Sequence, residues 1–444
     1  MVLFANSSTK ACAAALSALV LLGGSPVAVA STKDAGRASI LEVDVTDMPD
    51  LKEGQPSVAV NPRDPNNLVF VSTIFPPSPG LEPVGECFVA YSNDKGRTWT
   101  QVPWPMGDAV KCGEPSVVVN AQGTFYLDNN QVSSGLAANL LDHNQVSRST
   151  DGGRTWSAPV VTPLLLGGAP KLAVDLATGK VYAVAGEAWE YPSAVSVSSD
   201  GGRSFSAPRV IPGPMPCIEV APGIPLSCGY PGREIAVYGG ILVSVSQGEA
   251  GVVTFYVSRD DGQSWTSLPV TDSHGIGVPS GTGPLVPVPE LGAAADPVPW
   301  VAADPSRRGR FAVMVPRGSN LEVYITQDAG KTWTGPSVIS AVDAQRPAIS
   351  FGANGDLGVM WRTTTGNVFS VVSFDHGRSF STPVQVNHVT EPVGQSGPPG
   401  DRWSGITLAD GYVYVAWSDG RNDSPLEAIL GRVPLGLYQR PAAR

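Results

Sequence analysis

The stretch "STDGGRTWSAP" at residues 149–159 belongs to a set of six near copies, and this set decides the fold. The other copies read "SNDKGRTW" (92–99), "SSDGGRSF" (198–205), "SRDDGQSW" (258–265), "TQDAGKTW" (326–333) and "SFDHGRSF" (373–380). All share the pattern Ser/Thr-x-Asp-x-Gly-x-Ser/Thr-Trp/Phe without an insertion or deletion. Because an internal repeat constrains the whole architecture, it is interpreted before any single residue.

The sequence upstream of each copy also repeats. A short apolar run opens each unit: "PSVAVN" (56–61), "PSVVVN" (115–120), "PKLAVD" (170–175), "REIAVY" (233–238), "PWVAAD" (299–304) and "PAISFG" (347–352). A turn and a second apolar run follow, a third run leads into the repeated segment, and a fourth leaves it. Short runs that are rich in β-branched residues and bounded by turns predict a four-stranded meander in each unit.

A seventh unit at the C-terminal end has only three strands. They are "GITLAD" (405–410), "YVYVAWSD" (412–419) and "LEAILGRV" (426–433), whereas "SILEVDV" (39–45) is a lone strand near the N-terminus. A ring without an open seam forms if the lone strand completes the last sheet. We therefore predict an all-β fold, a seven-bladed β-propeller over residues 39–434. A six-bladed propeller with an extra hairpin is the alternative.

The composition narrows the functional classes. The chain has 444 residues, 50 of them Gly and 41 Pro, with 42% hydrophobic residues and a net charge of −10. This is a turn-rich globular composition with ample material for a core. Nucleic-acid binding needs a basic face, and the acidic balance gives no support for one.

The first thirty residues have the pattern of a signal peptide. Lys10 supplies the positive charge, "ACAAALSALVLLGG" (11–24) is an apolar run too short to span a bilayer, and "AVA" (28–30) is a small-x-small cleavage site. We expect cleavage after Ala30, a flexible N-terminus at 31–38, the propeller at 39–434 and a C-terminal tail at 435–444. The prediction is a secreted protein, extracellular or periplasmic, with no membrane span.

Four cysteines remain after that cleavage: Cys87, Cys112, Cys217 and Cys228. An even number in an exported chain favours disulfides over free thiols. Proximity in the sequence favours Cys87–Cys112 and Cys217–Cys228, although four cysteines allow three pairings.

The repeated segment resembles the Asp-box (BNR) repeat of the sialidase superfamily, and the resemblance covers most of residues 40–434. It implies a propeller fold. It does not by itself imply an activity, because the box occurs in sialidases, in other glycoside hydrolases, in sorting receptors and in proteins of no known activity. Its residues suit a structural turn: Asp151 can accept hydrogen bonds from turn N–H groups, Gly153 can take a positive φ, and Trp156 can pack between blades. We therefore expect structural roles for the box aspartates, which are Asp94, Asp151, Asp200, Asp260, Asp328 and Asp375.

The meander topology assigns each loop to one face of the ring. Asp boxes and the turns between first and second strands lie on one face, and the other connections lie on the opposite face. The long insertions all fall on that opposite face, at 74–87, 131–145, 209–232, 267–298 and 382–402. Since long loops on a rigid scaffold often carry function, the face opposite the boxes is the predicted working face.

Arginines are placed where they could bind an anion on that face. Arg233, Arg346 and Arg402 open innermost strands, and Arg362 and Arg421 close second strands. Guanidinium groups suit carboxylates. Sialidases clamp the substrate carboxylate with three arginines, so the resemblance makes the first three the substrate-binding candidates. The alternative is pairing with a neighbouring acid, Arg233 with Glu234, Arg402 with Asp401 and Arg421 with Asp419.

Glycoside hydrolysis needs a proton donor and a nucleophile or base. Eight carboxylates fall on or near the predicted working face: Glu86, Glu114, Glu187, Glu190, Glu219, Glu234, Asp401 and Asp419. The catalytic candidates among them are Glu219, Glu234 and Asp401. Sialidases use a Tyr activated by Glu as nucleophile, and this resemblance points to Tyr230. The Arg-Ile-Pro motif that the family carries before its first Asp box is absent here, and "EGQPSVAVN" (53–61) stands in its place.

No cofactor or metal is expected, because the four histidines do not cluster and no zinc-ligand spacing occurs. The sequence thus predicts an exported sialidase-like propeller that acts on or binds acidic glycans, in one interpretation as an exo-α-sialidase-type glycoside hydrolase. The alternative is a propeller that binds a carbohydrate or a protein and does no chemistry. The expected partner is a glycan or glycoconjugate and not a nucleic acid, and the chain is expected to be a monomer.

Overall fold

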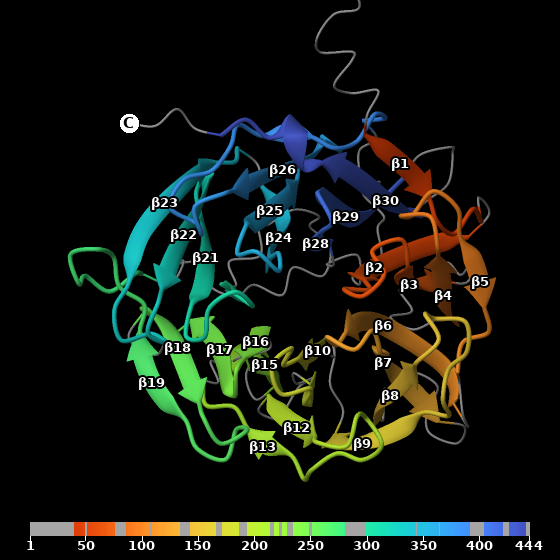
Figure 1. The fold of residues 1–444 in the computed structure, drawn as a ribbon. Coiled ribbons are helices and arrows are strands. Elements are labelled where there is room, and N and C mark those ends of the chain that lie inside the picture. Colours follow the sequence, from red (N-terminus) through yellow and green to blue (C-terminus); the bar gives the residue numbers. More distant parts are fainter. Residues whose placement is uncertain are drawn as a thin grey trace, which may run out of the picture.

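A computed structural model describes residues 40–48, 51–75, 86–105, 109–133, 143–165, 171–185, 193–213, 217–221, 224–228, 234–247, 251–279, 299–342, 344–363, 365–390, 404–420 and 426–440. These residues form seven four-stranded antiparallel sheets arranged as blades around one axis (Figure 1). The seven-bladed β-propeller is therefore confirmed, and the six-bladed alternative is wrong. No helix in the described part of the chain is long and apolar enough to cross a membrane.

Blades one to six run outward from the axis in chain order. Blade one has β2 (Lys52–Val60), β3 (Leu68–Phe75), β4 (Glu86–Ser92) and β5 (Thr100–Val102). Blade two has β6 (Ala109–Val119), β7 (Phe125–Ser133), β8 (His143–Ser149) and β9 (Val160–Leu165). Blade three has β10 (Lys171–Val174), β11 (Val181–Ala185), β12 (Ala194–Ser198) and β13 (Arg209–Val210). A two-stranded hairpin, β14 (Cys217–Ala221) and β15 (Ile224–Cys228), precedes blade four.

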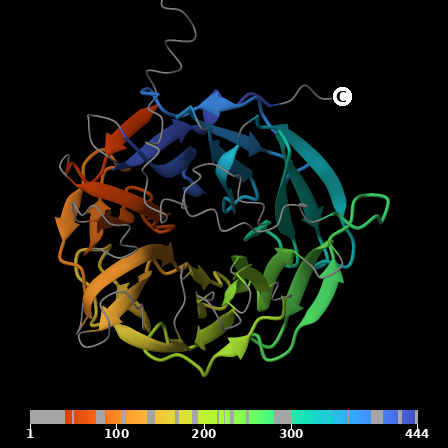
Figure 2. The ribbon, with the colours of Figure 1, turned by 180° about the vertical axis from the view of Figure 1, so that it is seen from behind.

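Blade four has β16 (Glu234–Tyr238), β17 (Ile241–Gln247), β18 (Val253–Ser258) and β19 (Thr266–Pro269). Blade five has β20 (Trp300–Ala303), β21 (Phe311–Arg317), β22 (Asn320–Thr326) and β23 (Thr334–Ser340). Blade six has β24 (Gln345–Phe351), β25 (Leu357–Arg362), β26 (Val368–Ser373) and β27 (Val384–Gln385). Figure 2 shows the ring from the other side, with the innermost strands again nearest the axis.

Blade seven closes the ring with both ends of the chain. It has β28 (Gly405–Ala409), β29 (Tyr412–Asp419), β30 (Glu427–Pro434) and, as its outermost strand, β1 (Leu41–Asp44). Leu41 is paired with Arg432 and Asp44 with Ile429, and β1 lies beside β30 in Figure 1. The predicted closure by the N-terminal strand is confirmed. A short 3-10 helix, η1 (Leu435–Leu437), follows, and Tyr438 is buried with its hydroxyl bonded to Ser370 of blade six.

The Asp boxes are hydrogen-bonded turns between third and fourth strands. In the second box, the Ser149 hydroxyl donates to Asp151 at 2.8 Å, and the other Asp151 oxygen accepts from the Thr155 hydroxyl at 2.5 Å. The amides of Arg154 and Thr155 also donate to Asp151. Gly153 has a φ of 90°, and a Cβ built there would lie 2.6 Å from Val69 of the preceding blade. The box carboxylates are therefore used within their own turns, as the sequence predicts.

The core lies between blades. Seven clusters of buried apolar side chains each join two neighbouring blades, one for every interface of the ring. The aromatic residue of each box packs there. Trp333, for example, lies between blades four and five with its ring 5.1 Å from that of Phe255. Each blade therefore packs apolar side chains against both of its neighbours.

Two observations bear on the cysteines. Cys87 is buried and disulfide-bonded. The side chain of Cys112 lies outside the described residues, so the pairing Cys87–Cys112 stays a prediction. Cys217 and Cys228 are directly opposite each other in β14 and β15. That backbone register suits a cross-strand disulfide, which also stays a prediction.

Candidate functional site

The innermost strand of each blade begins on the face opposite the Asp boxes. We call a set of six residues of these strands the axial mouth. Four of them open their strands or stand second in them: Lys171 (β10), Glu234 (β16), Trp300 (β20) and Arg346 (β24). The other two, Gln55 and Glu114, lie within β2 and β6. Every one of these residues has a polar or aromatic side chain. The axial mouth therefore gathers hydrogen-bonding and charged groups from sequence positions nearly 300 residues apart.

Three of these side chains converge from consecutive blades. Lys171 forms an ion pair with Glu234, and its ammonium nitrogen lies 4.6 Å from the centroid of the Trp300 ring. The side chains of Lys171 and Glu234 keep 18% and 12% of their surface exposed, so the pair lies at the surface of the mouth. An ammonium over an indole face is an attractive arrangement. Since Lys171 of blade three reaches Trp300 of blade five, the side chains meet near the axis.

A recurrent β-bulge shapes the other half of the mouth. Gly54 is paired with Thr73 and Ser57 with Val71, so β2 carries one extra residue between them. Blades two and six have the same irregularity, between Gly113 and Ser116 and between Gln345 and Ala348. β-Bulges redirect side chains and are common beside active sites.

The bulges share an unusual backbone conformation. Gln55, Glu114 and Arg346 occupy the corresponding position and have φ values of 58°, 53° and 49°. Each precedes a proline. A left-handed conformation at a residue other than glycine costs about 1–2 kcal/mol. Three occurrences at one structural position therefore mark the mouth as a place where the fold imposes backbone geometry.

The bulges of blades one and two are directly connected. The Glu114 amide donates to the side-chain oxygen of Gln55 at 2.9 Å and to the Thr73 hydroxyl at 3.1 Å. The Thr73 hydroxyl itself donates to Gln55 at 2.5 Å. Gln55 and Thr73 are 1% and 0% exposed, so this connection lies beneath the surface of the mouth.

The buried carboxyl group of Asp128 connects three strands of blade two next to the bulge. Asp128 on β7 accepts hydrogen bonds from the Ser116 hydroxyl at 2.6 Å and from Asn144 at 3.4 Å. Burial raises the pKa of Asp128 to about 7. The Ser116 hydroxyl in turn accepts the Leu172 amide of blade three at 3.3 Å. Asp128 therefore fixes the strand that carries Glu114 instead of facing solvent.

Most residues proposed from the sequence cannot be placed. Tyr230, Asp401, Arg233, Arg402 and Arg421 lie outside the described residues, and Glu219 is placed only through the backbone of β14. Glu234 is described, and its ion-pair partner is Lys171 of the neighbouring blade. Because Arg233 lies outside the described residues, its pairing with Glu234 stays a prediction.

Blade six places two of the predicted arginines near each other. Arg362 closes β25 opposite Gln345, the neighbour of Arg346 in β24. Arg346 is partly exposed, whereas Arg362 is only 2% exposed. Arg346 is therefore the arginine of this pair that can contact a ligand, and Arg362 lies behind it. Asp419, which the sequence offers as a partner for Arg421, accepts the Trp417 indole N–H at 2.7 Å.

Sequence reasoning missed Lys171 and Trp300. The signal was present in the repeat itself. When the opening runs "PKLAVD", "REIAVY" and "PWVAAD" are superposed, Lys171, Glu234 and Trp300 occupy the same second position. The corresponding residues of blades one and two are Ser57 and Ser116, whose hydroxyls accept amides of the next blade. In blades one, two and three, the residue at this position therefore contacts the innermost strand of the following blade.

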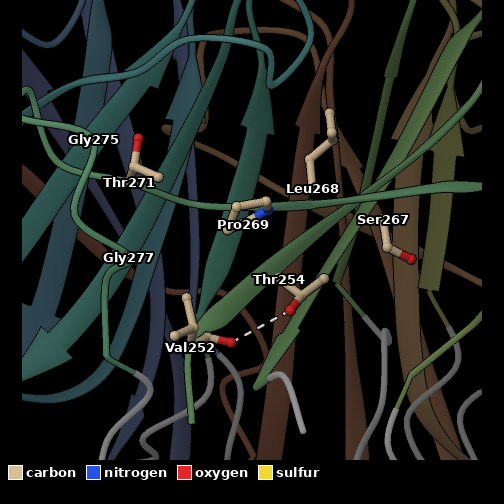
Figure 3. Close-up of a pocket in the computed structure, with 8 residues that line it drawn as sticks. All are labelled: Val252, Thr254, Ser267, Leu268, Pro269, Thr271, Gly275 and Gly277. Atoms are coloured by element: carbon tan, nitrogen blue, oxygen red, sulfur yellow. Dashed lines mark hydrogen bonds between the residues drawn. The ribbon is translucent and has the colours of Figure 1, made fainter. Parts of the chain in front are cut away.

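One cavity of the described structure lies away from the axial mouth. It has a volume of about 370 Å³ and is lined by residues of the third and fourth strands of blade four and of the segment that follows them (Figure 3). Its lining is Val252, Thr254, Ser267, Leu268, Pro269, Thr271, Gly275 and Gly277. No charged side chain belongs to this lining, so the cavity does not suit an acidic ligand. Within the described ranges, no cluster of His, Cys, Asp and Glu could hold a metal ion.

No family model matches the chain, and no curated protein is significantly similar to it in sequence. Solved structures similar to this chain include a protein of unknown function from Dyadobacter fermentans, with 13% identity and a TM-score of 0.44 over 89% of this chain and 99% of that one. They also include a Trypanosoma rangeli sialidase in complex with sialic acid, with 12% identity, a TM-score of 0.42 and 89% of this chain covered. The match spans 59% of that sialidase chain.

A polysaccharide lyase of family PL25, an ulvan lyase, is similar at 12% identity and a TM-score of 0.47, over 87% of this chain and 95% of the lyase. All three likenesses are likenesses of fold. The described residues form a seven-bladed β-propeller, the fold class that the Asp-box repeats predict.

Proposed function

We propose that this chain is an exported, carbohydrate-active propeller that holds an acidic sugar at the axial mouth. The observation that carries the proposal is the convergence of Lys171, Glu234 and Trp300. Small-molecule sites combine an aromatic or apolar surface with a few charged groups that fix orientation. The Trp300 ring offers a flat surface for a sugar ring, and Lys171 offers a cation for its carboxylate.

Arg346 supplies a second cation at the axial mouth. Its guanidinium can bind a carboxylate through two parallel hydrogen bonds, which an ammonium cannot do. Each charge-assisted hydrogen bond contributes about 1.5–3 kcal/mol. Loss of one such contact therefore weakens binding about 10- to 150-fold.

Export is supported by two observations. Residues 1–30 have the charge, apolar run and cleavage site of a signal peptide. Cys87 is disulfide-bonded, and disulfides persist in oxidising compartments. Both fit a protein that meets glycans outside the cytosol.

The test is binding of acidic oligosaccharides by the purified mature protein, measured by titration calorimetry with 3′-sialyllactose and with oligogalacturonate. We expect one of them to bind, and we expect Lys171→Met, Trp300→Ala and Arg346→Ala each to weaken binding at least about tenfold. Arg346→Lys should recover only part of the loss, because lysine lacks the planar fork. If the wild-type protein binds neither sugar, the proposal is wrong.

Lys180→Met is the matched control. Lys180 also forms an interblade ion pair, with Asp261 at 2.6 Å, but it lies on the Asp-box face. Its loss should change stability and leave sugar affinity unchanged. Incubation with fluorogenic sialosides and uronides then separates the two forms of the proposal: release of the fluorophore identifies a hydrolase, and binding without release identifies a carbohydrate-binding propeller.

A further inference from the structure

We propose that Glu234 is an internal competitor for Lys171, which holds the ammonium group over Trp300 until the carboxylate of an acidic sugar replaces it. Glu234 is then a specificity-determining residue, because a neutral sugar has no group that can take its place. This inference rests on the proposed function. It is carried by the ion pair between Lys171 and Glu234 and by the position of the same ammonium group over the Trp300 ring.

The first step concerns the cation of the proposed site. Lys171 of blade three is paired with the carboxylate of Glu234 in blade four. A sugar carboxylate that binds Lys171 therefore meets a second carboxylate beside the same ammonium group. The N–H donors of one ammonium group can contact both carboxylates, but the two negative charges repel each other at that short range. Glu234 therefore weakens the binding of an anionic ligand at this place.

The second step concerns the aromatic ring. The Lys171 ammonium nitrogen lies 4.6 Å from the centroid of the Trp300 ring, so it covers a face of the indole. Trp300 also packs against the apolar clusters between blades five and six and between blades six and seven. A sugar ring can therefore stack on the covered face only after the ammonium group moves aside. The ion pair with Glu234 opposes this movement.

The third step concerns the exchange of partners. The Lys171 and Glu234 side chains keep 18% and 12% of their surface exposed, so solvent screens the pair in part and its net contribution to stability is modest. A sugar carboxylate that replaces Glu234 restores an ion pair to Lys171, whereas a neutral sugar leaves the ammonium group without one. The opposite role, in which Glu234 orients Lys171 for the ligand, predicts the opposite sign for the effect of removing its charge.

The experiment is titration calorimetry with the acidic probe that the wild-type protein binds, either 3′-sialyllactose or oligogalacturonate. Glu234→Gln keeps the shape and a carbonyl acceptor for Lys171 but removes the negative charge. We expect it to tighten binding about 5- to 30-fold, opposite in sign to Lys171→Met. Glu322→Gln is the matched control, because Glu322 is paired with Arg317 and has 14% of its side chain exposed but lies in the third strand of blade five. Its affinity should stay within about twofold of the wild type.

Lys171→Ala tests the specificity with a second variant. It removes the ammonium group from the Trp300 ring, so it should lose affinity for the acidic probe and bind the neutral counterpart, lactose or an oligogalactose, more tightly than the wild type does. Unchanged or weaker binding of the acidic probe by Glu234→Gln overturns the competitor role. No gain of neutral-sugar affinity in Lys171→Ala overturns the claim that the ammonium group blocks the ring. A wild-type protein that binds neither acidic probe overturns the proposed function instead.

Discussion

Arg346 combines a left-handed backbone, with a φ of 49°, and a position on the axial mouth. Any side chain with a Cβ is strained in that conformation, and glycine is not. We predict that Arg346→Gly is more stable than Arg346→Ala by about 1 kcal/mol, while both lose affinity for an acidic sugar. Urea unfolding of the two variants measures the difference.

Ser350 on the same strand provides the control. Its φ lies outside the left-handed region, so glycine should be the worse residue there, by about 0.5–1 kcal/mol relative to alanine. The order of the two substitutions should therefore reverse between positions 346 and 350. The same order at both sites would mean that the conformation of Arg346 is not imposed by the fold.

Asp260 shows how a box residue responds to acid. Its carboxylate accepts hydrogen bonds from Ser264, through the hydroxyl at 2.5 Å and the amide at 2.9 Å, and from the Ser258 hydroxyl at 2.8 Å. These bonds, led by the Ser264 hydroxyl, lower the pKa of Asp260 from 3.8 to about 2. Because the folded pKa is the lower one, the stabilisation is present above pH 3.8 and is lost as pH falls toward 2.

We therefore predict that the free energy of unfolding decreases between pH 5 and pH 2, and that Asp260→Asn decreases less over this range while starting lower at pH 5. Denaturant unfolding at several pH values measures both curves. Asp272 also has a lowered pKa but belongs to a surface turn outside the boxes, so Asp272→Asn is a suitable comparison. Parallel curves for Asp260→Asn and the wild type would contradict the structural role of the box.

At the scale of elements, Glu53 connects the closing strand to the rest of the ring. It lies in β2, fully buried, and one carboxylate oxygen contacts the hydroxyl of Thr46, just after β1, and the amide of Ala428 in β30. Burial, as the largest cause, raises the pKa of Glu53 to about 8. Nearby Asp44 and Glu427 act in the same direction.

The sign of the pH effect follows from the raised pKa. The neutral form is favoured in the folded state, so the stabilisation is present below the unfolded value of 4.5 and is lost as pH rises toward 8. We predict that stability falls between pH 5 and pH 8.5, and that Glu53→Gln, which stays neutral, removes most of this slope. Thermal unfolding across that range decides the point. A slope that persists in Glu53→Gln must come from other groups.

The elements were largely predictable from sequence because their signals are local. Each Asp box satisfies its carboxylate within a few residues, so the pattern around Asp151 predicts a turn wherever it occurs. The closing strand was predictable for a different reason. Residues 426–433 need a partner at the ring's edge, and residues 39–45 had no sheet of their own.

The site was less predictable because its geometry depends on contacts between blades. A residue before proline is expected to be extended, yet Gln55, Glu114 and Arg346 are left-handed. The cause for Glu114 is visible only in three dimensions, where Gln55 and Thr73 of the preceding blade hold its amide. The meeting of Lys171 with Trp300 likewise depends on how innermost strands converge on the axis.

At the scale of the whole molecule, stability depends on the closure of the ring. Ile40 packs in the core between blades six and seven, and Val45 packs in the core between blades seven and one. Burial of an aliphatic side chain contributes about 1.5–3 kcal/mol, and β1 adds its ladder with β30. Removal of this segment therefore weakens two interfaces at once and leaves β30 as an open edge.

This dependence gives a prediction for a truncated chain that starts at Leu51. We expect a lower Tm than for the chain that starts at residue 31, and we expect a synthetic peptide of residues 40–48 to raise the Tm with increasing concentration, because it binds the folded ring only. Glu42 accepts the His388 amide at 2.6 Å, and the two side chains also contact at 3.1 Å. A peptide with Glu42→Ala should therefore restore the Tm less effectively, and a scrambled peptide should not restore it. An equal Tm for both chains, or a truncated chain that does not respond to the native peptide, would show that the ring is stable without its N-terminal strand.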